Sequence, residues 1–437
     1  MVIILRKKIK NKKLEKKRKV SIFRAFSSRN YRLYFSGQSI SLIGTWMQKT
    51  AVPWVIYIQT HSLFMLGLSA FATQFPSFLF SLFGGVVSDR YNKYRVLLAT
   101  QILSLIQALL LAILVLSKHY TAWEIMGVSV ILGIINAFDV PARQSLVYDM
   151  VDNKEDLPNA IALNSSMVNL AKIAGPAFAG IVLEKLGAGL CFMLNAVSFL
   201  AVIISLLFMR FDKPITSNKS KKPIKELKEG FTYITTTPEI GFILLFITVM
   251  SLLVLPYDAL LSVYAKDIFN GNASTLGYLN SFIGVGAIGG TIFLASLKDK
   301  SNLKTILLIA TFIFGVGLIL FSHITDFKWA CVFAIMMGFG MMALSTISNT
   351  ILQTTSITEM RGRVISYFAM AFFGMRPLGS LLIGWIAKYI GAPNTVLMEG
   401  IAALLVFGSF SFFMRKAILK KKQQSNLESE ETILEKI

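Results

Sequence analysis

Residues 85–95 read Gly85-Val-Val-Ser-Asp89-Arg90-Tyr-Asn-Lys93-Tyr-Arg95 and separate two long apolar runs, 63–88 and 95–117. Each run exceeds the roughly 20 apolar residues that an α-helix needs to cross the hydrocarbon core of a bilayer. The cations gather in the short segment and are otherwise absent from both runs, which is typical of a loop on the cytoplasmic side of a membrane. These residues therefore predict two membrane-spanning helices joined by an inner loop.

The same alternation of apolar runs and short polar segments continues along the chain. The sequence is 54% hydrophobic and only 15% charged, whereas about a quarter of the residues in a soluble domain are charged. We therefore expect an all-α polytopic membrane protein with twelve transmembrane helices. The expected spans are 36–58, 63–88, 95–117, 122–144, 158–184, 189–210, 240–265, 275–297, 303–322, 328–355, 363–388 and 394–414.

The distribution of the cations decides what the net charge of +21 means. A nucleic-acid-binding protein gathers its basic residues on one folded face, whereas here they fill every second connection between spans. The remaining connections, such as those at His61, Gly187 and Pro393, are short and poor in charge. The pattern argues against nucleic acid and for a lipid bilayer as the partner, and the strict alternation predicts that both termini are cytoplasmic.

A polar segment at 211–239 divides the spans into two sets of six, and related positions in the two sets lie roughly 209 residues apart. Internal duplication is common among secondary transporters, whose substrate site lies between the repeats. Apolar residues recur at helical spacing inside the segment, which predicts an amphipathic helix on the inner membrane surface; they are Ile224, Leu227, Phe231 and Ile234. The expected organisation is a basic cytoplasmic tail at 1–35, pseudo-symmetric six-helix bundles at 36–210 and 240–414, the central loop at 211–239 and a second tail at 415–437.

The loop at 85–95 also carries a motif. Its residues are Gly85, Asp89, Arg90, Lys93 and Arg95. Glycine lets two helices approach closely, a carboxylate can cap a helix start, and the cations can pair with acids on the inner face. The spacing resembles the loop between the second and third helices of the major facilitator superfamily.

Spans four to six extend the resemblance. The segments Phe138-Asp-Val-Pro-Ala-Arg-Gln144, Leu157-Pro-Asn-Ala-Ile-Ala-Leu-Asn164 and Gly175-Pro176 are similar to one branch of that superfamily, the transmembrane secretion effector type. This branch holds the enterobactin exporter and the macrolide-efflux proteins. The resemblance covers nearly the whole chain and implies export across the cytoplasmic membrane of a bacterium, driven by the proton gradient. We further expect a monomer that handles protons and a small-molecule substrate.

Span five carries small residues around a proline, at Ala171, Gly175, Pro176, Ala179 and Gly180. The pattern resembles the antiporter motif of the superfamily, with alanine in place of two glycines. Small residues permit tight helix contact, and proline bends a helix and frees a carbonyl group. Plain close packing is the alternative interpretation.

Several charged residues lie inside the expected spans, where each costs about 2.5–3.5 kcal/mol on insertion scales. Lys49, Lys172 and Arg376 fall near mid-depth, which favours a cavity for an anionic or hydrogen-bonding substrate. The predicted lining of this cavity is Trp46, Gln48, Lys49, Trp54, Lys172 and Arg376. The alternative is that some of these cations form structural pairs, for instance Lys49 with Asp258 as an outer gate.

The acids expected in the cavity are Asp139 and Asp258 only. We predict that one of them carries the coupled proton, because the three histidines fall in outer loops. Asp139 lies nearer the cytoplasm than Asp258, and Arg143 lies close to the inner interface. The alternative to a role in coupling or gating is that Asp139 and Arg143 form a structural pair or contact the loop with Asp89 and Arg90.

The sequence shows no metal-ligand spacing, no phosphate-binding glycine loop and no catalytic constellation. We therefore expect a protein that is not an enzyme and needs no cofactor or metal, with Cys191 and Cys331 as buried apolar residues. The favoured function is proton-coupled export of a small amphiphilic compound, either a siderophore or a drug such as a macrolide. The mid-depth cations favour an anionic siderophore. The alternatives are an importer of a small molecule or lysolipid, and a non-transporting membrane receptor with the same fold.

Overall fold

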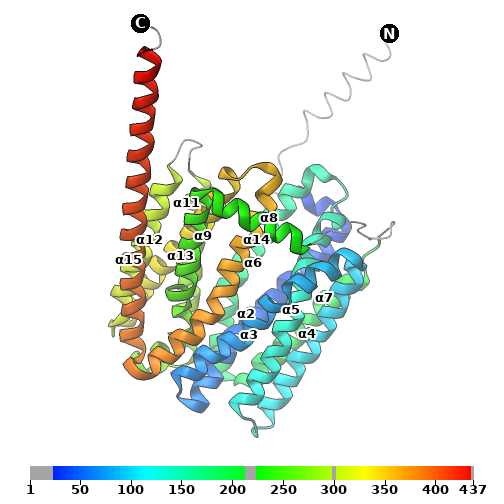
Figure 1. Cartoon of the computed structure of the whole chain (residues 1–437). Helices are drawn as coiled ribbons and strands as arrows, with labels where there is room; N and C mark the ends of the chain where they lie inside the picture. The colour runs from blue at the N-terminus through cyan, green and yellow to red at the C-terminus, as the bar shows by residue number, and fades with distance from the viewer. Residues whose placement is uncertain (1–22, 212–222, 298–301, 435–437) are drawn as a thin grey trace, which may run out of the picture.

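The computed structural model describes residues 23–211, 223–297 and 302–434, apart from the side chains of 89, 223–227 and 413–434. Within these ranges all regular structure is helical. The long helices stand side by side in one bundle (Figure 1). This confirms the predicted all-α polytopic architecture.

The first half of the chain forms six long α-helices. After the short η1 (Arg24–Ser27) these are α2 (Arg29–Thr60), α3 (Leu63–Arg90), α4 (Lys93–Leu116), α5 (Ala122–Met150), α6 (Leu157–Lys185, preceded by η2, Lys154–Asp156) and α7 (Ala188–Leu207). Prolines inside α2, α3, α5 and α6 do not end these helices. The sequence placed the start of the first span at residue 36, and the structure extends this helix by two turns toward the N-terminus.

The second half is less regular. It comprises α8 (Pro223–Thr236), α9 (Pro238–Leu253), η3 (Leu255–Leu260), α10 (Leu261–Val263), η4 (Tyr264–Ile268), α11 (Ala273–Ala295), α12 (Leu303–Ser322), α13 (Phe327–Thr355), α14 (Thr358–Ala369), η5 (Met370–Gly374) and α15 (Met375–Leu434). The segment η3 is a 3-10 helix, and η4 and η5 are π-helical. Among the described residues, every such interruption within a membrane-spanning segment lies in this half.

Ten stretches of the described chain are long and apolar enough to cross a membrane. The last of them, Thr358–Phe412, contains a sharp bend at Gly391, where φ is +81°, a conformation that glycine adopts without strain. It therefore supplies two crossings. The helix α2 lies outside the ten because its polar and charged residues lower its hydropathy, yet it runs through the bundle with its neighbours. Together they give the twelve predicted spans.

Polar side chains cap the start of several helices, whereas α2, α6 and α7 begin without such a cap. Thr121 and Glu124 form a reciprocal capping box at the start of α5, and Asn272 and Thr275 do the same for α11. Such caps satisfy amide groups that the first helical turn leaves without partners. The starts of α5 and α11 therefore follow from short-range sequence signals.

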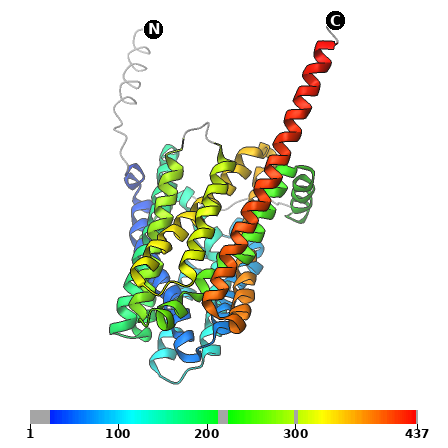
Figure 2. The same ribbon diagram turned by 90° about the vertical axis from the view of Figure 1, so that its left-hand side faces the viewer.

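The start of α2 and the end of α15 lie at the same end of the bundle, which we call the termini end (Figures 1 and 2). The opposite, far end carries the turns near His61, Lys118, Gly187 and Asn270 and the bend at Gly391. The predicted amphipathic helix is present as α8 and lies across the termini end (Figure 1). Arg363 of α14 forms an ion pair of 2.8 Å with Glu229 of α8 and so fixes this helix to the bundle.

The two halves meet along two seams, one between α6 and α11 and one between α3 and α15. Glycines permit both approaches. A Cβ atom at Gly180 would lie 2.8 Å from Cα of Ser274, and one at Gly384 would lie 2.8 Å from Cα of Gly67. Both crossings are close to the far end, so the halves are joined there by backbone-to-backbone packing.

Candidate substrate site between the two halves

Trp46 of α2 is the centre of a cationic cluster. The Nζ atom of Lys49 lies 4.4 Å from the centroid of its ring, and Nζ of Lys172, from α6, lies 5.8 Å from it. Cations within about 6 Å of an aromatic face are attracted by the ring quadrupole. Neither lysine forms an ion pair with any acid in the described part of the chain. The structure thus brings together three of the predicted cavity residues.

Arg376 of α15 faces the same region but has a partner. Its guanidinium lies 2.5 Å from a carboxylate oxygen of Asp258 in η3, and its field acts on both Lys49 and Lys172. The structure therefore assigns Asp258 to Arg376 and not to Lys49, the pairing that the sequence analysis kept as an alternative. The buried Nε atom of Arg376 has no hydrogen-bond partner among the described residues.

A third acid accompanies this pair, and it is absent from the predicted set of cavity residues. Glu399 lies in α15, eight residues beyond the bend at Gly391, with no solvent exposure. The field of Asp258 acts on it. The expectation that only Asp139 and Asp258 supply acids to the interior is therefore wrong. A lone Glu inside the predicted span 394–414 was the available signal.

Two residues predicted for the cavity lie elsewhere. Gln48 is buried on another side of α2, where its amide donates to Gln107 (3.1 Å) and accepts from Asn195 (2.7 Å). Trp54 lines a shallow pocket near the far end, together with Gln59 and Tyr120. That pocket contains no charged residue.

Asp139 and Arg143 form an ion pair of 3.1 Å one helical turn apart on α5. Asp139 is almost fully buried and also accepts hydrogen bonds from Thr100 (3.0 Å) and Gln101 (2.6 Å) of α4. Its carboxylate is therefore well satisfied within the first half. This geometry corresponds to the structural pair that the sequence offered as an alternative to a role in coupling.

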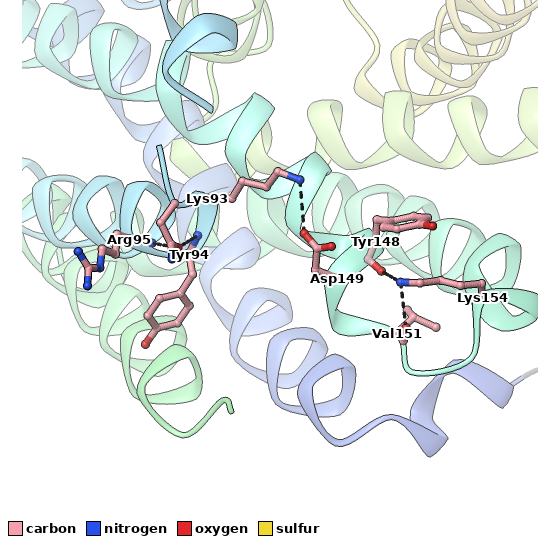
Figure 3. Close-up of polar contacts among 8 residues, drawn as sticks. Lys93, Tyr94, Arg95, Tyr148, Asp149, Val151 and Lys154 are labelled. Atoms are coloured by element: carbon pink, nitrogen blue, oxygen red, sulfur yellow. Dashed lines mark hydrogen bonds and ion pairs between the residues drawn. The ribbon is translucent and has the colours of Figure 1, made fainter. Parts of the chain in front are cut away.

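The basic residues of the loop between α3 and α4 differ in their surroundings, and Figure 3 shows Lys93 beside Asp149. Lys93 forms an ion pair of 3.4 Å with Asp149 near the end of α5, as expected for a cation pairing with an acid at this face. Arg90 and Arg95 are exposed. Asn92 caps α4 by accepting from the backbone amides of Tyr94 and Arg95, so the cap is not Asp89, whose side chain lies outside the described residues.

The close helix approach expected at Gly85 occurs one residue earlier. A Cβ atom at Gly85 would meet nothing within 4 Å, whereas one at Gly84 would clash with the carbonyl oxygen of Ala137 in α5. Gly84, within α3, is therefore the position at which close packing against α5 requires a glycine. Successive helical residues point about 100° apart, and the sequence does not show which of the two faces α5.

The small residues of span five serve two contacts at once. Gly175 packs against Trp46 of α2 within its own half, and the carbonyl of Pro176 and the backbone of Gly180 pack against Gly277 of the other half. Ala171 and Ala179 are buried. Span eleven follows the same scheme, because Gly379 packs against Leu252 of its own half and Gly374 against Phe78 of the other.

Polar contacts also join the halves at the far end. The hydroxyl of Tyr57 in α2 donates to Asp267 of η4, and that of Ser274 in α11 donates to Glu184 of α6. Nearer the centre of the seam, Ser281 donates to the carbonyl of Ile173 (2.8 Å). These contacts and the glycine crossings join the two halves on the far-end side of Trp46.

Metal chemistry finds no support in the described part of the chain. No three His, Cys, Asp or Glu side chains gather there in an arrangement that could hold a metal ion. Cys191 and Cys331 are free and buried, as predicted.

Comparison with known proteins gives the fold a family. The profile of the transmembrane secretion effector family matches residues 20–436. The staphyloferrin A transporter of Staphylococcus aureus is 27% identical over 90% of this chain and 99% of its own length. The enterobactin exporter EntS of Shigella flexneri is 23% identical over 86% of this chain and 89% of its own length.

A solved structure supports the same fold. A POT family transporter, crystallised with a thioalcohol-conjugated peptide, superposes with a TM-score of 0.71 at 15% identity, covering 89% of this chain and 96% of that one. With a profile match over almost the entire length, twelve crossings and two six-helix halves around an interior cationic cluster, the chain belongs to the transmembrane secretion effector family of major facilitator superfamily transporters.

Proposed function

We propose that this protein is a secondary active transporter that exports a small anionic amphiphile, of the siderophore kind, across the bacterial cytoplasmic membrane in exchange for protons. The observation that carries the proposal is the pair of lysines around Trp46. Lys49, which is exposed, and Lys172, which is half-buried, lie on membrane-spanning helices without an acidic partner in the described chain. A cation in such a position is costly, so it marks a pathway for a substrate or ion.

The composition of the cluster indicates the class of substrate. Two lysines and one partly paired arginine leave an excess of positive charge around an indole ring. An anionic compound with aromatic or planar groups would neutralise the cations and stack on Trp46. A cationic macrolide would meet repulsion from the same groups. The names of the two relatives reported above, a staphyloferrin A transporter and an enterobactin exporter, support a siderophore.

The closed far end supports a direction of access. We infer that both termini are cytoplasmic, so that the far end faces outward and the contacts of Tyr57 with Asp267 and of Glu184 with Ser274 hold the outer side together. A substrate would then reach Trp46 from the cytoplasm. This is the conformation in which an exporter loads.

Fluorescence of Trp46 can test the proposal directly. A variant that keeps Trp46 and carries phenylalanine at the other four tryptophans (54, 123, 329 and 385) would be purified and titrated with staphyloferrin A, enterobactin and erythromycin. We expect quenching by an anionic siderophore and none by erythromycin. In proteoliposomes, the compound that quenches Trp46 should also move against its gradient when a pH gradient is imposed.

Lysine substitutions sharpen this test. A charge-assisted hydrogen bond contributes about 1.5–3 kcal/mol, and about 1.4 kcal/mol is tenfold in affinity, so Lys172→Gln should weaken binding roughly tenfold or more. Lys185→Gln is the matched control, because Lys185 lies exposed at the far end of the same helix. Unchanged affinity in Lys172→Gln, or quenching by erythromycin alone, would contradict an anionic substrate.

A further inference from the structure

Glu399 is a buried carboxyl group that belongs neither to the predicted cavity nor to the proposed substrate cluster. Its side chain has no solvent exposure, and neither carboxyl oxygen has a hydrogen-bond partner among the described residues. The next residue, Gly400, packs directly against Gly315 and Ile319 of α12. Glu399 is therefore enclosed between α15 and its neighbours.

An ionised carboxylate in this position would be very unstable. Burying a charge without partners costs far more than burying a neutral group, and a carboxyl group in such surroundings keeps its proton instead. Asp139 provides the contrast inside the same protein, because it has Arg143, Thr100 and Gln101 around it. Burial alone does not separate the two acids; the presence of donors does.

The ionisable groups around Glu399 come from a few elements. From η3 these are Asp258 and Tyr257, and from η4 Tyr264, and each interacts electrostatically with Glu399. The other elements packed on α15 add little near it: α12 has only Lys304 and α9 only Glu239, and these two pair with each other at the termini end. The segment η5 has none, and α3 has only Asp89 and Arg90 in its last turn.

Asp258 and Arg376 connect this carboxyl to the substrate cluster. Asp258 is bound to Arg376, is partly exposed, and lies close enough for its field to act on Glu399. Two neighbouring carboxyl groups resist simultaneous ionisation, and here only Asp258 has the Arg376 cation as its partner among the described residues. A change in the partner of Arg376, for instance on binding an anionic substrate, therefore changes which of the two acids holds a proton.

We propose that Glu399 is the proton-binding group of the second half. It holds a proton in the conformation described here, and the O–H bond breaks when a rearrangement brings water or Arg376 to the carboxyl. The proton then passes to water or to the Asp258 carboxylate, and Glu399 is left ionised. This proposal rests on the proposed proton-coupled transport, and it gives that coupling a residue outside the substrate cluster.

Infrared spectroscopy tests the protonation without any substrate. The full-length protein in lipid at neutral pH should show the carbonyl stretching band of a protonated carboxylic acid. Glu399→Gln, which has the same shape and no acid, should lose this band, whereas Asp139→Asn should keep it. A band that persists unchanged in Glu399→Gln, or that disappears in Asp139→Asn instead, would overturn the proposal.

A second variant guards against a folding defect. Glu399→Asp retains the acid with a shorter side chain, so it should keep a protonated-carboxyl band at a shifted frequency if Glu399→Gln cannot be purified. A band at its wild-type frequency in Glu399→Asp would also contradict the assignment.

Transport then tests the coupling. With staphyloferrin A as the probe, Glu399→Gln should retain exchange between equal concentrations on both sides but lose accumulation driven by a pH gradient. Equal loss of both would show that Glu399 does not couple protons. If the wild-type protein moves no probe at all, the proposed function fails while the infrared result still decides whether Glu399 holds a proton.

Discussion

Individual polar residues in this protein differ chiefly in whether their neighbours satisfy them. Asp139 and Gln48 are buried with two or more hydrogen-bond or ion-pair partners each. Lys49 and Lys172 lack acidic partners, and Glu399 lacks donors, within the described chain. We therefore expect the first group to maintain the fold and the second group to act on substrate and protons.

Asp139→Asn should destabilise the protein. Removing one member of a buried ion pair costs about 3–5 kcal/mol, because the other charge is left uncompensated. Denaturant unfolding of the purified protein in detergent would measure the loss. The double variant Asp139→Asn with Arg143→Gln should recover part of it. A single variant of wild-type stability that no longer transports would instead support the coupling role that the sequence suggested.

Gln48→Leu should also lower stability without affecting the substrate site. The change leaves the amides of Gln107 and Asn195 without their partner, at about 1–3 kcal/mol for each unsatisfied group. Binding measured by Trp46 fluorescence should stay the same. Weaker binding at normal stability would return Gln48 to the cavity that the sequence predicted for it.

These residues also show how far a sequence can define a site. The spacing of Asp139 and Arg143 predicts their pairing, because residues four apart face each other on a helix. The local sequence does not show which side of α2 faces the other half. It therefore places Gln48 and Lys49 in one cavity, although their side chains point about 100° apart around the helix. The sequence shows Glu399 as an acid inside an apolar span. It does not show that Glu399 lacks partners, because this depends on how α12 and η3 pack around it.

At the level of helices, small residues determine which elements can meet. Gly67 of α3 and Gly384 of α15 bring two backbones together at the far end, and Gly180 with Gly277 does the same across the other seam. Each seam thus consists of backbone contacts that any larger side chain would separate.

Gly67→Val should open the far end. The added side chain would clash with the carbonyl of Ser380, so the seam between α3 and α15 cannot close. In a variant with Cys191 and Cys331 replaced by alanine and Lys49 by cysteine, a membrane-impermeant maleimide should react faster from outside the cell once Gly67→Val is added. Gly127→Val is the control, because a Cβ atom there meets nothing within 4 Å.

If Gly67→Val leaves the labelling rate unchanged, the seam does not control access.

The sequence predicted the small residues of span five but missed the pairing of Gly67 with Gly384. Hydropathy locates helices, whereas the pairing of helices depends on residues more than 300 positions apart that no local pattern relates.

For the whole molecule, the predicted spans agree with the observed helices to within a few residues at most ends. The long apolar runs and the caps between them carry this information, so the architecture was predictable. The relation between the halves was not, because it depends on which small residues of one half meet those of the other across the two seams.

Reporter fusions can test the membrane orientation. A reporter enzyme that works only outside the cytoplasm should be active when it is fused at His61, Lys118, Gly187, Asn270 or Asp326. A reporter that works only in the cytoplasm should be active when it is fused near Tyr91, near Asp152 or after Leu434. A start of α2 and an end of α15 on opposite sides would contradict the twelve-span fold.

The interrupted helices of the second half have a mechanical consequence. In the first half the helices continue through their prolines and are connected by amide and ion-pair networks, so we expect this half to be stiff. In the second half η3, η4 and η5 interrupt the regular α-helix; Asp258 lies within η3, and η5 ends just before its partner Arg376. We therefore expect the two halves to move differently during transport. The first half should rotate as a rigid body, whereas the second half should bend at its interrupted helices, next to the groups that change their charge.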